Sequence, residues 1–313
     1  MRSGTTGSGA IAPRYSLTLV VPAALAGVAV AWALTAPDAV QAEAPVRALA
    51  DGLGATVLGL AVLPRLHARI PPAWRLLAVF GGLWAATEFM LLSIEAAEVV
   101  GVRPTRLRTG DFGHYLAHIS AGQIGIGVMI GTVAVTVYAA LAHHQPDRAT
   151  PDPVVVFAAV TLELRPITGH MSQQLLGSVL AAVHVLAASV WFGLLLAMAL
   201  VLRGRGEWAA ILPRYSRWAL PAVAAVTGTG IVNGLVHIGD LAALLNTGYG
   251  RILLAKAVMV TALIALGRWW RGHWVPAAAA HRMPAASSLR RALIELIVMA
   301  VVFGLAAALS VTA

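Results

Sequence analysis

The sequence contains no cysteine, a single lysine and few charged residues of any kind. Without cysteine the chain cannot form disulfides, thiolate metal sites or a cysteine nucleophile, so any metal site must use histidine, methionine, carboxylate or backbone groups. Charged residues make up only 11% of the 313 positions, 59% are hydrophobic, and the mean hydropathy is +0.81. Because so little polar surface cannot cover a soluble globule, the sequence predicts a polytopic membrane protein.

Long apolar runs predict an all-α bundle of about nine transmembrane helices, each of about 20 residues. The runs cover residues 15–35, 46–64, 73–95, 113–141, 153–170, 173–202, 216–238, 250–270 and 289–312. We divide the chain into an N-terminal anchor or signal-like helix, 1–45, and a single membrane domain, 46–313. A retained first helix is favoured, since its apolar core is long for a signal peptide; cleavage after Ala42 would leave eight helices.

The net charge of +9 indicates orientation in the membrane, because the arginines lie in loops between apolar runs. Most of the 22 basic residues fall on the side of the N-terminus, so the positive-inside rule predicts a cytoplasmic N-terminus and an outer C-terminus. We therefore expect a multi-pass protein of a bacterial cytoplasmic membrane, with the lipid bilayer as its surroundings and no nucleic-acid partner.

Five of the ten histidines fall in the outer half of the predicted bundle: His114, His118, His170, His184 and His237. His114 and His118 are four residues apart, a spacing that lets two imidazoles on one helical face chelate one ion. The same stripe continues through Gly122, Gly125 and Met129. A solvated histidine pair at the membrane interface is the alternative.

His170 and Met171 place an imidazole and a thioether side by side at the outer end of the fifth span. This pair of borderline and soft ligands suits copper better than magnesium or calcium, although Met171 could be apolar filler. His184 lies about eleven residues into the sixth span, near mid-membrane, where an imidazole needs a partner. A neutral histidine hydrogen-bonded between helices is the alternative to a metal ligand.

The seventh span carries a stripe in which Asn233 and His237 lie one turn apart near the outer end. Gly230 and Gly234 form a small-residue face that favours close helix packing. A transport role for Asn233 and a structural one are equally supported.

Ionisable side chains lie within several other spans, where their burial makes each a functional hypothesis. Asp51 and Glu88 are expected in the outer halves of the second and third spans, with Lys256 as their natural counter-ion in a structural ion pair. Glu163 and Glu295 are expected towards the cytoplasmic ends, on an exit path or paired with nearby arginines such as Arg165.

The order of several short motifs resembles the copper resistance protein D (CopD) family. The motifs are Gly169-His170, the segment from His184 through Trp191 to Gly193, and then four further segments: 214–221, 227–234, 249–256 and 289–295. The resemblance is clearest over 165–312 and extends more weakly over 46–141.

The resemblance implies an integral inner-membrane protein that handles copper delivered on the outer side, with a small periplasmic partner of the copper resistance protein C type. It implies inward movement of copper for cuproenzyme assembly. His170 and Met171 would receive the ion, His184 would relay it, and His237, His118 and His114 would be co-ligands. Because copper binds deprotonated imidazole, uptake should weaken below about pH 6.5.

Two other classes stay open, and enzymatic chemistry is not expected because no nucleophile constellation is present. Bis-histidine haem ligation needs two histidines on facing helices, which His118, His184 and His237 could supply. The second class is a non-transporting assembly or sensing subunit that binds copper only at its outer face.

Overall fold

The computed structural model describes residues 15–36, 42–168, 177–237 and 242–312, and all the regular structure in these ranges is helical. Eight of the described helices are long and apolar enough to cross a membrane. The expected all-α, polytopic membrane bundle is therefore confirmed. Helices suit a membrane because each one satisfies its backbone hydrogen bonds within its own segment.

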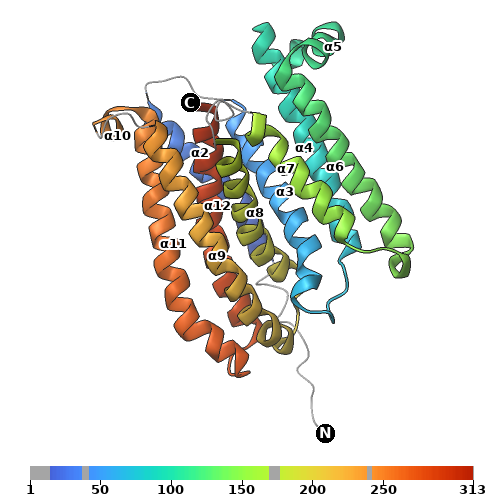
Figure 1. Cartoon of the computed structure of the whole chain (residues 1–313), viewed down its shortest axis with the longest axis vertical. Coiled ribbons are helices and arrows are strands. Elements are labelled where there is room, and N and C mark those ends of the chain that lie inside the picture. Colours follow the sequence, from blue (N-terminus) through green and yellow to red (C-terminus); the bar gives the residue numbers. More distant parts are fainter. Residues whose placement is uncertain (1–14, 37–41, 169–176, 238–241, 313) are drawn as a thin grey trace.

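The long helices run alternately up and down, so that successive long helices begin at opposite ends of the bundle (Figure 1). In chain order they are η1 and α2 (Ser16–Leu19 and Val20–Thr35), α3 (Ala44–Leu66), α4 (Trp74–Val100), α6 (Ser120–His144), α7 (Asp152–Thr168), α8 (Gly177–Val201), α9 (Arg205–His237), α11 (Gly248–Ala279) and α12 (Ala285–Thr312). Each predicted span corresponds to one of them. Helix α7 is described over 17 residues, up to Thr168, and is not among the eight helices that meet the length and hydropathy of a membrane span.

Four short elements connect the long helices. They are η2 (Pro104–Arg106) and α5 (Thr109–His118) between α4 and α6, η3 (Pro146–Arg148) between α6 and α7, and α10 (Ala243–Asn246) before α11. The prediction of one continuous helix over 113–141 is wrong. Ile119 has extended backbone angles, φ −105° and ψ 129°, which end α5 and allow α6 to start at Ser120.

Helices α3, α8 and α12 form the centre of the bundle and contact one another. Helices α4, α6 and α7 pack on one side of this centre, whereas α2, α9 and α11 pack on the other (Figure 1). The main apolar core includes the fully buried Trp84, Trp208 and Trp274. The many exposed apolar side chains of α4, α6, α9 and α11 form the surface that faces lipid.

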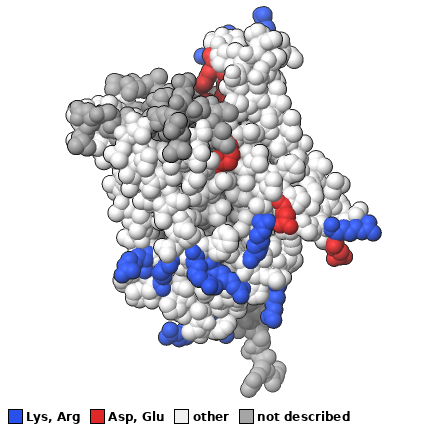
Figure 2. Space-filling model, viewed as in Figure 1, with Lys and Arg blue, Asp and Glu red and all other residues white. Residues whose placement is uncertain are grey.

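The charges are distributed unequally between the two ends of the bundle. In Figure 2 most of the visible arginines form a band at the end from which α2, α9 and α12 start, which we call the arginine-rich end. The opposite end carries Glu43, Glu95 and Glu98 together with Arg106 of η2 and the flanking Arg103 and Arg108. By the positive-inside rule, we expect the arginine-rich end to face the cytoplasm and the opposite, outer end to face the exterior.

Candidate functional site

A cluster of ion pairs occupies the outer half of the bundle between α3, α4 and α7. Arg165 of α7 donates through Nη2 to Glu88 Oε2 (3.1 Å) and through Nη1 to Glu95 Oε1 (2.6 Å), both on α4. Arg47 of α3 donates through Nη2 to the same Glu95 oxygen (3.1 Å). We call these four residues the outer ion cluster. Two guanidinium groups shared between two carboxylates satisfy charges that would be costly to bury alone.

Neighbouring side chains complete the hydrogen bonds of the two carboxylates. Trp84 Nε1 donates to Glu88 Oε1 (3.1 Å), and the Tyr115 hydroxyl on α5 donates to Glu95 Oε2 (3.1 Å). Burial raises the pKa of Tyr115, and the charge of Glu95 adds to this rise, so the phenol stays protonated and able to donate. Every carboxylate oxygen of Glu88 and Glu95 therefore has a partner, and the cluster ties α5 to the bundle.

The expected pairing of Lys256 with Glu88 or Asp51 is wrong. Glu88, only 5% exposed, takes its positive partner from Arg165, and Lys256 makes no ion pair with any described residue. Asp51 lies one turn after Arg47 on α3, within electrostatic range of Arg47 and Arg165. A signal for the true pairing is present in the sequence, because Arg165 stands within an apolar run, where a cation needs a carboxylate partner on another helix.

Glu163 also differs from expectation. Helix α7 runs from the arginine-rich end to the outer end, so Glu163 lies in its outer half and not near the cytoplasm. Arg165 pairs with α4 instead, and neither carboxylate oxygen of the buried Glu163 has a hydrogen-bond partner among the described residues. Glu295 does lie in the first half of α12, where Trp191 is its hydrogen-bonding neighbour.

His184 is held between α8 and α9. Its Nδ1 lies 2.8 Å from Thr229 Oγ1, and its ring faces Gly230, where an added Cβ would lie 3.6 Å from Cε1. Because 3.6 Å is an ordinary van der Waals distance, an alanine at Gly230 would touch the imidazole without displacing it. Gly234 faces Leu253 of α11, which would lie 3.1 Å from an added Cβ.

The hydrogen bonds of Thr229 favour one tautomer of His184. The Thr229 hydroxyl donates to the carbonyl oxygen of Ala225 (2.6 Å), so its oxygen is left to accept. In this arrangement His184 donates from Nδ1–H and Nε2 is the nitrogen that remains for a ligand, while the Val226 carbonyl is a further hydrogen-bonding neighbour of the ring. An imidazole oriented through Nδ1 and open at Nε2 is the arrangement in which histidine binds metals.

Lys256 of α11 lies close enough for its charge to act on the His184 ring. Lys256 is half-buried, and because it is the only lysine of the chain, no other side chain carries a primary amine. Asn233, one turn beyond Thr229 on α9, is also half-buried. Helices α8, α9 and α11 therefore bring His184, Thr229, Asn233 and Lys256 to one region of the bundle, which we call the histidine region.

His114 and His118 do not join the histidine region. They lie on α5, which packs on α4 and α6, and both side chains are exposed. Their ring centroids are 4.7 Å apart, so the expected proximity of the two rings is present. The expected continuation of their stripe through Gly122, Gly125 and Met129 is broken at Ile119, and that part of the prediction is wrong.

The remaining predicted ligands are not described. His170 and Met171 lie outside the described residues, and His237 is the last residue of α9, with no side-chain description. Among the residues that the structure does describe, no three histidine or carboxylate side chains converge on a point that could hold a metal ion.

The fold and these buried polar groups define a class: a multi-pass helical membrane protein with ionisable side chains held between its helices. Within this class, residues 209–309, from α9 to α12, match the family model described as copper resistance protein D. The resemblance to the copper resistance protein D family is thus confirmed over these helices. The matched part includes Thr229, Asn233 and Lys256, whereas His184 lies before it.

A curated relative points to the same kind of function. The chain is 29% identical over 126 residues to the copper transport protein CutJ of Bacillus subtilis (strain 168). The match covers 37% of this chain but only 23% of that protein. No solved structure matches the chain. The similarity supports a copper-related membrane protein of the transporter type.

Proposed function

We propose that this protein binds copper ions as cargo and moves them from the outer side of a bacterial cytoplasmic membrane inward, with His184 as the relay ligand. The observation that carries the proposal is the His184–Thr229 hydrogen bond, which orients the imidazole and leaves Nε2 open within the bundle. The similarity to copper resistance protein D and to a copper transport protein supports copper as the ion.

His184 supplies one nitrogen, and copper requires further donors. We assign them to His170 and Met171 at the outer mouth and to His237 at the end of α9, with Asn233 as a polar lining group. The exposed His114 and His118 pair on α5 would capture copper at the outer surface, where a periplasmic partner of the copper resistance protein C type could deliver it. We assign a structural role to Glu88, which belongs to the outer ion cluster, and to Asp51, which lies beside that cluster.

Copper binding to purified variants tests the relay. His184→Ala should lower copper affinity by about tenfold or more, because a soft or borderline ion loses a nitrogen ligand. The matched control is His143→Ala, which removes an exposed histidine at the arginine-rich end. Titration with Cu(I) under reducing conditions and with Cu(II) in air, read by competition with a chromophoric chelator, measures both. Equal affinity in wild type and His184→Ala would remove His184 from the site.

The oxygen of Thr229 can be tested separately from the imidazole. Thr229→Val keeps the shape of the side chain but removes the acceptor for Nδ1–H, so the ring loses its orientation and copper binding should weaken about three- to tenfold. Thr229→Ser restores the oxygen and should recover most of the affinity. If the valine and serine variants bind copper alike, the hydrogen bond has no part in binding.

Transport is tested with the full chain in proteoliposomes. Copper accumulation inside the vesicles by wild type, and its loss in His184→Ala, would distinguish a transporter from a subunit that only binds copper at its outer face. A bis-histidine cytochrome is the other alternative. No second described histidine faces His184, since the others lie on α5 or at the arginine-rich end. A Soret band after haem supplementation would favour the cytochrome.

A further inference from the structure

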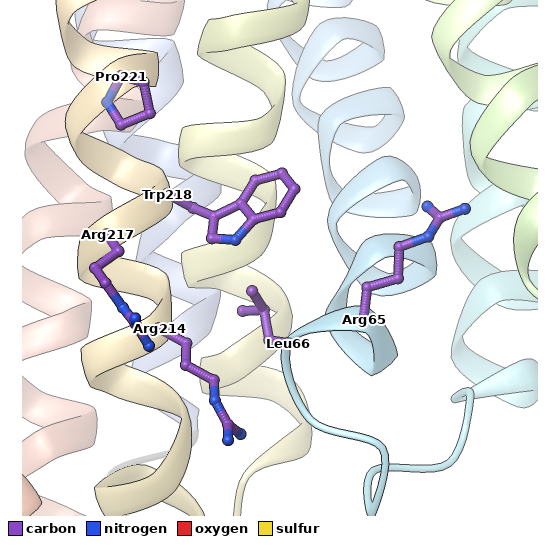
Figure 3. A pocket seen from close by; sticks show the side chains of 6 residues that line it. All are labelled: Arg65, Leu66, Arg214, Arg217, Trp218 and Pro221. Atoms are coloured by element: carbon purple, nitrogen blue, oxygen red, sulfur yellow. The ribbon is translucent and has the colours of Figure 1, made fainter.

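A pocket of about 590 Å³ lies near the arginine-rich end, far along α9 from the histidine region. Its lining comes from the last turn of α3 and the first half of α9: Arg65, Leu66, Arg214, Arg217, Trp218 and Pro221. Figure 3 shows Trp218 lying between α9 and α3, with the Arg214 and Arg217 side chains directed towards the arginine-rich end. The pocket thus has an apolar part and, next to it, a cationic part.

The positive charge of this pocket is not neutralised by the described part of the protein. Arg65 is paired with Asp152 at the start of α7, and in Figure 3 its side chain is directed away from Arg214. No acidic residue lines the pocket, and neither Arg214 nor Arg217 has an ion-pair partner among the described residues. The one glutamate near the start of α9, Glu207, accepts hydrogen bonds from backbone N–H groups at the helix start.

The apolar part of the pocket opens to the lipid-facing surface. Trp218 is 50% exposed, and Leu220 on the same stretch of α9 is 58% exposed. Tryptophan at this depth, next to arginines at a helix end, is the arrangement that proteins place at the level of lipid headgroups. An occupant of the pocket must therefore carry a negative charge at one end and apolar groups at the other.

We propose that this pocket binds one anionic phospholipid of the cytoplasmic leaflet. Arg214 and Arg217 hold the phosphate, since guanidinium groups donate paired hydrogen bonds to phosphate oxygens. Trp218, Leu66 and Pro221 contact the glycerol backbone and the first methylene groups between α9 and α3. A basic pocket between transmembrane helices on the cytoplasmic side has the chemistry that such headgroups require. Copper has no part in this binding.

Native mass spectrometry of the delipidated full-length protein, titrated with phosphatidylglycerol, cardiolipin or phosphatidylcholine, tests the proposal. Wild type should retain one phosphatidylglycerol or cardiolipin and show no matching affinity for phosphatidylcholine. Arg214→Gln combined with Arg217→Gln should weaken anionic lipid binding on the order of 10- to 30-fold. The matched control is Arg268→Gln combined with Arg290→Gln, which removes two exposed arginines from the same end outside the pocket.

Two further measurements distinguish a bound lipid from a bound inorganic anion. Phosphatidylglycerol with brominated acyl chains should quench the fluorescence of Trp218, so the quenched fraction should fall in Trp218→Phe. Millimolar inorganic phosphate should not displace the lipid. The proposal is overturned if the control pair loses as much lipid as the pocket pair, if phosphatidylcholine binds equally well, or if phosphate alone competes. Variants are compared only when they elute as a single folded peak, and Trp218→Phe preserves a test if the double variant does not.

Discussion

At the residue scale, the polar side chains inside this bundle divide into two kinds. In the outer ion cluster both carboxylates are bonded at every oxygen, so its arginines and glutamates are committed to holding α3, α4 and α7 together. His184 is hydrogen-bonded to Thr229 through Nδ1, and we assign its other nitrogen, Nε2, to a ligand. This difference, more than depth in the membrane, distinguishes the candidate functional residue from the structural ones.

Arg165 gives a prediction at this scale. Its replacement by Gln leaves the nearly buried Glu88 without an ion-pair partner and Glu95 with Arg47 alone, so stability should fall by roughly 2–4 kcal/mol. Thermal unfolding of the protein in detergent, followed by intrinsic fluorescence, measures the change. Arg165→Lys should recover only part of it, because an ammonium group cannot bridge two carboxylates as a fork.

The matched control for Arg165 is Arg148→Gln, which removes an exposed arginine of η3 that has no ion pair among the described residues. Its midpoint should stay close to that of wild type. A midpoint unchanged in Arg165→Gln as well would mean that the outer ion cluster contributes nothing to stability.

At the scale of single elements, hydrophobic length predicted every crossing helix, because about 20 apolar residues are needed whatever the neighbours are. Length could not predict the break at Ile119, since residues on both sides are compatible with helix and the break depends on α5 docking through Tyr115 onto Glu95. It could not pair the charges either. Which carboxylate meets Arg165 depends on how α4 and α7 pack, which no single span contains.

Helix contact between α3 and α8 gives a prediction at the element scale. A Cβ added at Gly193 would overlap the backbone carbonyl of Ala55, and one at Gly59 would overlap the backbone of Gly193. Gly193→Ala must therefore push two central helices apart and should cost about 1–3 kcal/mol. Gly228→Ala on α9, where an added Cβ meets nothing within 4 Å, should leave the thermal midpoint unchanged. Equal midpoints for the two variants would contradict the close packing.

At the scale of the whole molecule, the candidate sites lie at different depths of the bundle. The outer end carries the ion cluster and the exposed histidine pair, the interior carries the histidine region, and the arginine-rich end carries the pocket proposed to bind lipid. The family match covers residues 209–309, so it includes Thr229, the hydrogen-bond partner of His184, but not His184 itself. The proposed relay therefore lies where the family-matched helices meet the rest of the bundle.

The short uncharged stretch of α7 has a consequence for the surrounding bilayer. Between Asp152 and Glu163 it spans residues 153–162, ten residues or about 15 Å at 1.5 Å each, against a hydrocarbon core of ~30 Å. Its exposed Val156, Phe157 and Val160 face lipid. Glu163 and Arg165 are directed into the bundle, and the uncharged stretch of α7 is shorter than that of the neighbouring α6, which carries no Asp, Glu, Lys or Arg between Ser120 and His144.

The bilayer is therefore expected to be thinner along this one flank, a hydrophobic mismatch built into the molecule. Reconstitution into phosphatidylcholine bilayers of increasing acyl length tests it: the thermal midpoint should be highest with short chains of about 14 carbons and fall as the chains lengthen to about 20. A midpoint that rises steadily with chain length would contradict the mismatch. In a membrane of mixed lipids, short or disordered lipids would therefore be enriched around α7. Water would then have its shortest path to the outer ion cluster on this flank.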